Sequence, residues 1–332
     1  MSLATAPSPL TLAETELSEV IRALKCSGLW IDVGAVSIHV KSGCREFAAQ
    51  LQTAYSEFPF VDHADWADIH VQIQRPIGLR RWIRPQVILR CDGQQPFEPF
   101  PSDCGLPLFE WGCNWLIGRR LNDLLLLHAG IVEKDGLALL LPALPGSGKS
   151  TLAAALSWRG WRLLSDEFGA FDPDSYTFRA LLKPVALKNE SIQVIRRFAP
   201  HATFGPEFPK TRKGAVAHLA AQRETVELRH LGAQPGAVIL PKWEAGSHTR
   251  LERIAEHILF PTLAFNAFNY NLQGAIGFNA VVRLVRQCPA WQLVYSDLDD
   301  AVATVETAWT EMLSERKRAR IDANPPCNHL SA

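Results

Sequence analysis

Hydrophobic and polar positions alternate in some stretches near the start of the chain and recur at helical spacing in others. Alternating, β-rich stretches predict strands, and the stripe formed by Phe47, Leu51 and Tyr55 predicts a helix. A proline-rich stretch over residues 96–107 then separates this β-rich part from the rest of the chain, and we expect the domain seam there. The predicted strands are residues 29–40, 69–74 and 86–91, and the predicted helices are residues 14–24 and 44–55.

The later part of the chain has a different pattern. Residues 137–141 are apolar at every position, as in a central strand covered on both faces. An apolar helix over residues 152–158 comes next, and Gly160 ends it. We therefore expect an α/β protein with three parts: a β-rich N-terminal segment of unknown role (1–110), a larger α/β domain (111–315) and a polar tail (316–332). The remaining predicted elements are strands near 131–133, 161–164 and 291–295, and a helix from Leu298 to about 313.

Composition narrows the class of protein. Thirty-four Lys and Arg residues balance thirty-four Asp and Glu residues, so the chain lacks the basic excess of a duplex nucleic-acid binder. The longest apolar runs stop far short of the roughly 20 residues that span a bilayer. The N-terminus lacks the basic and apolar regions of a signal peptide. Seven scattered cysteines without a CxxC pair indicate reduced thiols. We expect a soluble, cytoplasmic protein without nucleic acid or a membrane span.

The strongest chemical signal is a glycine-rich loop between the strand at 137–141 and the helix after it. Glycines at 146 and 148 allow backbone N–H groups to approach phosphate oxygens, and the helix N-terminus adds partial positive charge. Lys149 supplies a point charge for the β- and γ-phosphates, and the Ser150 hydroxyl is placed to ligate Mg²⁺. The first glycine of the usual pattern is Ala143 here. The predicted nucleotide-binding residues are Pro145, Gly146, Ser147, Gly148, Lys149, Ser150 and Thr151.

Two adjacent carboxylates, Asp166 and Glu167, come after the strand at 161–164. Ligands of open α/β sheets bind at the carboxyl ends of strands, so these acids should face the bound phosphates. One carboxylate can ligate Mg²⁺ while the other accepts a proton from an attacking hydroxyl. The alternative is a pair of acids on a solvated edge.

Several other polar residues have open interpretations. His128 ends a run of leucines and is either a satisfied core residue or part of the site. Lys183 and Lys188 flank a strand-like segment and either reach a phosphate or are solvated. Residues 210–214 form a basic loop that either contacts an anion or is an exposed turn.

These features together resemble the catalytic domain of bacterial HPr kinase/phosphorylase, in which a histidine, two hairpin strands, a phosphate loop and an acidic strand end occur in this order. The similarity to HPr kinase itself covers about residues 120–190. A similarity to the branch called HPr kinase-related kinase A covers most of the chain. The segments that carry it are residues 110–115 (EWGCNW), 145–151 (PGSGKST), 160–167, 184–192, 213–219 and 268–270 (FNY).

The resemblance implies that residues 111–315 form a P-loop kinase-like domain with a fold shared with HPr kinase and phosphoenolpyruvate carboxykinases. It also implies ATP and Mg²⁺ as cofactors and a serine hydroxyl as acceptor. It implies Asp166 as general base, Glu167 and Ser150 on the metal side, Lys149 on the phosphates, and His128 contacting the γ-phosphate or orienting Asp166. Members of this branch are associated with PqqD-like peptide-binding proteins, which favours a peptide or small-protein acceptor. HPr kinases assemble into rings, so an oligomer is possible.

Three functions remain open from the sequence. The first is an ATP- and Mg²⁺-dependent kinase that acts on a hydroxyl of a peptide or small protein. The second is a small-molecule kinase with the same machinery, because the acceptor pocket lies in unfamiliar segments. The third is a nucleotide-gated binding module without transfer, which would not need the acidic pair.

Overall fold

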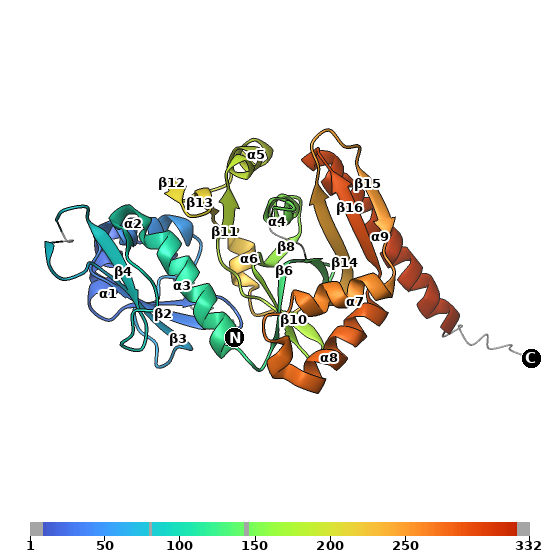
Figure 1. The fold of residues 1–332 in the computed structure, drawn as a ribbon, viewed down its shortest axis with the longest axis horizontal. Helices are drawn as coiled ribbons and strands as arrows, with labels where there is room; N and C mark the ends of the chain where they lie inside the picture. Colours follow the sequence, from blue (N-terminus) through green and yellow to red (C-terminus); the bar gives the residue numbers. More distant parts are fainter. Residues whose placement is uncertain (1–8, 80–81, 143–145, 324–332) are drawn as a thin grey trace, which may run out of the picture.

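The computed structural model describes residues 9–79, 82–142 and 146–323, and within these ranges the chain forms three β-sheets with flanking helices (Figure 1). This arrangement confirms the predicted α/β class at the level of mixed helices and sheets. None of the helices within these ranges is both long and apolar enough to cross a membrane.

The first sheet has five strands in the order β1-β2-β3-β4-β5 within the described residues. Buried and more exposed side chains alternate along β2 and β3, so one face is apolar and helices pack on the sheet. Tyr55 and Phe109 meet edge to face where α2 and α3 pack together. The elements are α1 (Leu17–Lys25), β1 (Leu29–Asp32), β2 (Ser37–Ser42), α2 (Arg45–Ala54), β3 (Ile69–Gln74), β4 (Gln86–Arg90), β5 (Phe100–Pro101), a 3₁₀ turn (Ser102–Cys104) and α3 (Gly105–Arg120).

The single strand predicted over residues 29–40 is wrong, because the chain turns back on itself there. Gly34 adopts φ +106°, and β1 and β2 pair antiparallel on either side of it. A Cβ at Gly34 would lie 2.7 Å from the Ala180 carbonyl oxygen, so the turn has no room for a side chain at this position. The helix predicted over 44–55 is confirmed as α2, and the strand predicted over 69–74 is confirmed as β3.

The predicted boundary between residues 110 and 111 falls inside α3, which packs against β3 and β4. The five-stranded sheet and the helices α1, α2 and α3 form the first layer of the protein. The chain leaves this layer after Arg120 and enters the long strand β6, Leu125–Lys134. β6 contains His128 and three of the four leucines before it, and it extends well beyond the strand predicted near 131–133.

The largest sheet has the order β10-β9-β6-β7-β14-β16-β15, with β8 paired to β6, in the described part of the chain. β7, β14 and β16 run parallel, so their carboxyl ends lie at one edge. α4 packs on this sheet and against α9, while α7 and α8 pair as a helical hairpin beside β6 (Figure 1). The elements are β7 (Leu137–Pro142), α4 (Lys149–Ser157), β8 (Arg162–Ser165), β9 (Phe168–Asp172), β10 (Thr177–Arg179), β14 (Gln234–Trp243), β15 (Arg250–Arg253), α7 (Glu256–Phe265), α8 (Tyr270–Gln287), β16 (Ala290–Tyr295) and α9 (Leu298–Ala323).

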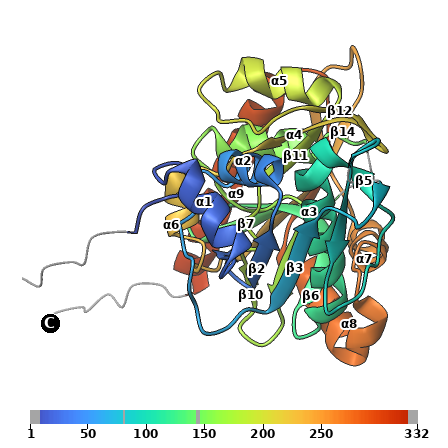
Figure 2. The same ribbon diagram turned by 90° about the vertical axis from the view of Figure 1, so that its left-hand side faces the viewer.

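A three-stranded sheet, ordered β11-β13-β12 within the described residues, lies between the first layer and the large sheet (Figures 1 and 2). β11 and α5 both contact α4, so this sheet borders the helix that follows the glycine-rich loop. Its elements are β11 (Val185–Lys188), α5 (Glu190–Phe198), β12 (Phe208–Thr211), β13 (Gly214–Leu219) and α6 (Arg223–Glu227).

The last helix, α9, is longer than the sequence pattern predicts. It continues from Leu298 through the basic run to Ala323. Residues 311–320 are rich in Glu, Lys, Arg and Ala, which are strong helix formers. Arg316 also donates to the Gly236 carbonyl oxygen at 2.7 Å, which holds the extension against β14.

Candidate functional site

The glycine-rich loop joins the end of β7 to the first turn of α4, as its sequence predicts. Gly146 and Gly148 adopt φ +86° and +90°, a left-handed conformation that favours glycine. The predicted nucleotide-binding residues from Gly146 to Thr151 lie in this turn, where the N–H groups at the start of a nine-residue helix are open to an anion. Pro145 and Ala143 lie outside the described residues.

Two residues from distant strands hold the loop in place. The Trp243 backbone N–H donates to the Ser147 carbonyl oxygen at 2.9 Å, and the Tyr295 hydroxyl donates to the Gly148 carbonyl oxygen at 3.3 Å. A Cβ at Gly148 would lie 2.4 Å from the Tyr295 hydroxyl oxygen, so this glycine is required by space as well as by φ. The sequence predicts neither anchor, because no local pattern marks residues that meet only through the fold.

Lys149, at the start of α4, pairs with His128, which is partly buried on β6. Lys149 Nζ lies 3.1 Å from His128 Nε2, and Lys149 is 8% exposed. An ammonium group has no lone pair, so Nε2 accepts and the imidazole proton lies on Nδ1. Burial and the Lys149 charge both lower the pKa of His128, which keeps the ring neutral. Burial also lowers the pKa of Lys149, against the opposing effect of Asp166 and Glu167.

Asp166 and Glu167 lie between β8 and β9, and they differ in electrostatic environment. Burial raises the pKa of Asp166, although the nearby Lys149 charge and a hydrogen bond with the Ser150 side chain act in the other direction. Burial also disfavours ionisation of Glu167, but the charges around it, Lys149 first, lower its pKa overall. The two acids therefore divide into a more basic carboxylate and one that stays ionised.

Three side-chain atoms around the loop are buried without a hydrogen-bond partner among the described residues: Ser147 Oγ, His128 Nδ1 and Asp166 Oδ1. The nearest acidic oxygen to His128 Nδ1 is Glu167 Oε1 at 3.8 Å, which is too long for a hydrogen bond. Buried polar groups of folded proteins are nearly always paired, so three such atoms in one place indicate a binding site for a polar ligand.

The donor set fits a magnesium ion bound together with a phosphate. Within the part of the chain that the structure describes, no three His, Cys, Asp or Glu side chains gather as metal ligands. Mg²⁺ needs fewer protein ligands than that, because it takes one or two carboxylates and completes its shell with water and phosphate oxygens. Ser150 lies beside Asp166, and Glu167 is the next residue, so these side chains could supply such a shell.

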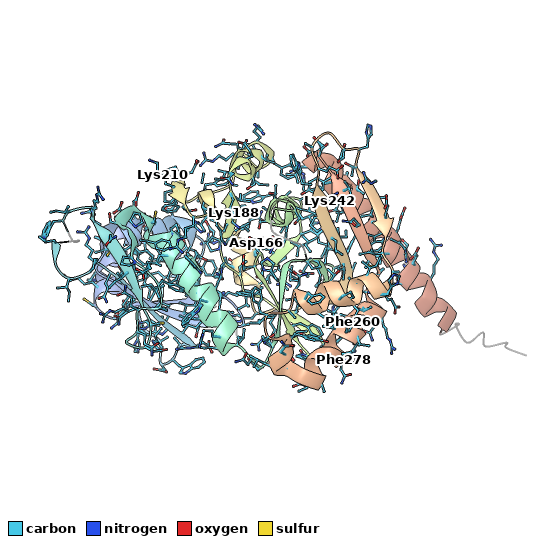
Figure 3. All side chains as sticks on the ribbon, viewed as in Figure 1. Asp166, Lys188, Lys210, Lys242, Phe260 and Phe278 are labelled. Atoms are coloured by element: carbon cyan, nitrogen blue, oxygen red, sulfur yellow. The ribbon has the colours of Figure 1, made fainter. Side chains whose placement is uncertain are left out.

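The lysines whose roles the sequence leaves open separate into two groups. Lys188 lies at the end of β11, next to Asp166 in Figure 3, and its charge acts to lower the pKa of both Asp166 and Glu167. The Lys213 charge acts to lower the pKa of His128 and of Lys149. By contrast, Lys210 lies farther out on β12 (Figure 3), and Arg212 stacks 5.7 Å from the Trp111 ring. The basic loop at 210–214 therefore contributes only part of its charge to the site.

Lys183 is neither solvated nor free to reach a phosphate. It is 8% exposed, and Nζ lies 3.0 Å from Glu110 Oε2 on α3. Asn114 Oδ1 accepts from the same ammonium group, and the Tyr55 hydroxyl donates to Glu110 at 2.5 Å. This buried network joins the first layer to the segment before β11. The sequence gives no role to Glu110 or Asn114, although both stand in the EWGCNW segment.

Comparison of the sequence with protein-family models gives no match, and comparison with curated proteins gives none either. The function of this chain is therefore inferred from the geometry of the site.

Proposed function

We propose that this protein is a kinase that uses ATP and Mg²⁺ to phosphorylate a hydroxyl group, in particular a serine hydroxyl, of a peptide or small protein. One observation carries the proposal: the buried atoms without partners beside the phosphate loop are Ser147 Oγ and His128 Nδ1, which can donate, and Asp166 Oδ1, which accepts. A phosphoryl group offers hydrogen-bond acceptors and an alcohol offers a donor. These two reactants together would therefore supply a hydrogen-bond partner to each of the three atoms.

Each residue has a role that its environment supports. The N–H groups at the start of α4 and the Lys149 ammonium bind the phosphates and hold the γ-phosphoryl group in line with the acceptor. Ser150 and Glu167 would hold Mg²⁺, which neutralises phosphate charge when bound. His128 donates its Nδ1 proton toward the phosphoryl oxygens.

Asp166 is suited to accept the proton of the attacking hydroxyl. Its pKa is raised by burial, and a more basic carboxylate is a better general base. Glu167 is suited to the cation because surrounding positive charge keeps it ionised. This division agrees with the roles that the resemblance to HPr kinase implies.

The fold, the acceptor and the location belong to the same proposal. The order of hairpin strands, phosphate loop and acidic strand end supports a domain like that of HPr kinase and phosphoenolpyruvate carboxykinase. The resemblance supports a polypeptide acceptor, delivered with a PqqD-like partner. Six cysteines in the described residues are free thiols, which supports a cytoplasmic location.

The test is transfer of label from [γ-³²P]ATP in the presence of Mg²⁺ to serine peptides and to small hydroxyl compounds. We expect Asp166→Asn to lower the transfer rate by about 10²–10⁴-fold while ATP binding persists, and Lys149→Ala to abolish transfer. Asp174→Asn, an exposed acid in the turn between β9 and β10, is the matched control and should retain full activity.

The outcomes separate the three functions. Substantial transfer by Asp166→Asn would refute the assignment of the base. Label on small compounds alone would identify a small-molecule kinase. Tight ATP binding without label on any acceptor would favour a nucleotide-gated binding module.

A further inference from the structure

The helical hairpin formed by α7 and α8 has an unusual composition. Residues 258–282, a stretch of 25 residues, contain no Asp, Glu, Lys, Arg or His. At the 20% charged content of the chain, a stretch of this length would carry about five charged residues. The stretch covers most of both helices, so charged residues occur only at the ends of the hairpin, at the start of α7 and in the last turns of α8.

Much of this uncharged hairpin faces solvent. Phe265 is 91% exposed and Leu272 is 75% exposed. Phe260 and Phe278 pack edge to face between the helices, with ring centroids 5.6 Å apart, at the lower right of Figure 3. Clustered apolar side chains in water mark interaction sites more often than scattered ones do. The exposed apolar residues are Ile258, Phe265, Phe268, Leu272, Ile276 and Phe278.

The hairpin is fastened to the strand that carries His128. The His128 N–H donates to the Asn266 carbonyl oxygen at 2.6 Å, and the Phe268 N–H donates to the Leu126 carbonyl oxygen at 2.8 Å. The Phe268 ring lies 5.6 Å from the His128 ring and 4.7 Å from the ring of Phe168, the residue after Glu167. Exposed apolar side chains therefore occur beside the site, at Phe268, and along both helices of the hairpin.

We propose that the α7–α8 hairpin is the docking surface for the acceptor polypeptide and that it selects uncharged, apolar residues next to the acceptor hydroxyl. This inference rests on the proposed kinase function. A hydroxyl that attacks a phosphoryl group must approach it to within about 3.5 Å, so the residues beside it must cross the surface around His128. On the hairpin side that surface contains Phe268 and offers no charge to pair with an acidic or basic peptide.

The composition also argues against two other occupants. Helices that bind anionic membranes carry Lys and Arg along their polar face, whereas the arginines of α8, Arg283 and Arg286, lie only in its last turns. A second copy of the chain on this surface would cover Phe268 and obstruct approach to His128.

The test measures peptide binding separately from transfer. In one variant a photo-crosslinking amino acid replaces Phe265. In the control variant it replaces Leu231, an apolar residue between α6 and β14 that is 56% exposed. The probes are two serine peptides of equal length, one with leucine beside the serine and one with glutamate in the same positions. We expect the leucine peptide to crosslink at position 265 about tenfold more than the glutamate peptide, with no preference at position 231.

A charge placed on the hairpin should remove this preference. Ile276→Asp should weaken binding of the leucine peptide about tenfold and leave ATP affinity unchanged. The matched variant is Leu231→Asp, because Ile276 and Leu231 are 58% and 56% exposed, and it should change neither quantity.

Each alternative result overturns the inference in a recognisable way. Equal crosslinking of both peptides would exclude apolar selection. Crosslinks between two copies of the chain would assign the hairpin to self-association. Binding to anionic vesicles that Ile276→Asp abolishes, without peptide crosslinks, would assign it to a membrane surface. A crosslinking preference for the leucine peptide without transfer of ³²P to any peptide would support the docking surface and contradict the proposed kinase. Transfer of ³²P to peptides without a crosslinking preference would support the kinase and contradict the docking surface.

Discussion

The ion pair between Glu110 and Lys183 joins α3 of the first layer to the segment before β11, beside the candidate site. Both residues are nearly buried, at 7% and 8% exposed, and the two charges lie 3.0 Å apart. Removal of one partner leaves the other charge in the interior without its counter-charge. We therefore expect Lys183→Met to lower the free energy of unfolding by about 3–5 kcal/mol.

The assay is urea unfolding of a double-mutant cycle with Glu110→Gln, Lys183→Met and the double variant. The double variant buries two neutral groups, so it should lose less stability than the sum of the single variants, with a coupling of about 1–3 kcal/mol. The exposed pair Arg159–Asp299 is the control, and its disruption should cost about 0.2–1 kcal/mol. A cost for Lys183→Met no larger than this control would refute the reasoning from burial.

Three further substitutions test the buried residue His218, the glycine-rich loop and the carboxylate Asp166 after β8. Burial lowers the pKa of His218 from 6.5 to about 4, so the folded state binds fewer protons than the unfolded state and loses stability as pH falls through this window. His218→Leu should reduce that acid-induced loss by about 3 kcal/mol in urea titrations from pH 7 to 4. Gly148→Ala should weaken ATP binding at least about tenfold in calorimetry, while Gly160→Ala, with φ +87° and open space, should leave ATP binding unchanged. Because burial raises the pKa of Asp166, Asp166→Asn should raise the melting temperature at pH 7, and the gain should fade at lower pH as the wild-type carboxyl takes up a proton; a lower melting temperature at pH 7 would contradict this.

The parts of the fold that the sequence predicts are those that local rules determine. The helix over 44–55 and the strand over 69–74 are expected from the spacing of apolar residues, and the observed elements agree. The turn at Gly34 was not predicted because the residues on both sides of it are β-rich. Its positive φ and the close approach of the Ala180 and Arg229 carbonyl oxygens, which explain the glycine, are known only from the fold. The extension of α9 also depends on a distant contact, from Arg316 to Gly236.

The site divides in the same way. The strand, the loop and the helix are contiguous, so the conformations of Gly146 and Gly148 can be expected from the local sequence. Glu110 and Tyr295 come from elements far along the chain, and nothing near either residue indicates that it meets Lys183 or the loop. A sequence pattern identifies chemistry carried by one segment, whereas the partners that position this chemistry depend on the tertiary fold.

The atoms at the centre of the site do not by themselves distinguish an acceptor alcohol from water. Asp166 Oδ1 would accept a proton from either, and a kinase that admitted water would only hydrolyse ATP. Discrimination must therefore come from groups outside the reacting atoms. The hairpin that carries Phe268 meets this requirement, because an apolar peptide held on it would displace water from the surface next to His128 at the moment that its own hydroxyl arrives. In the kinase that we propose, the absence of charge along residues 258–282 would therefore couple selection of the acceptor to exclusion of the competing nucleophile.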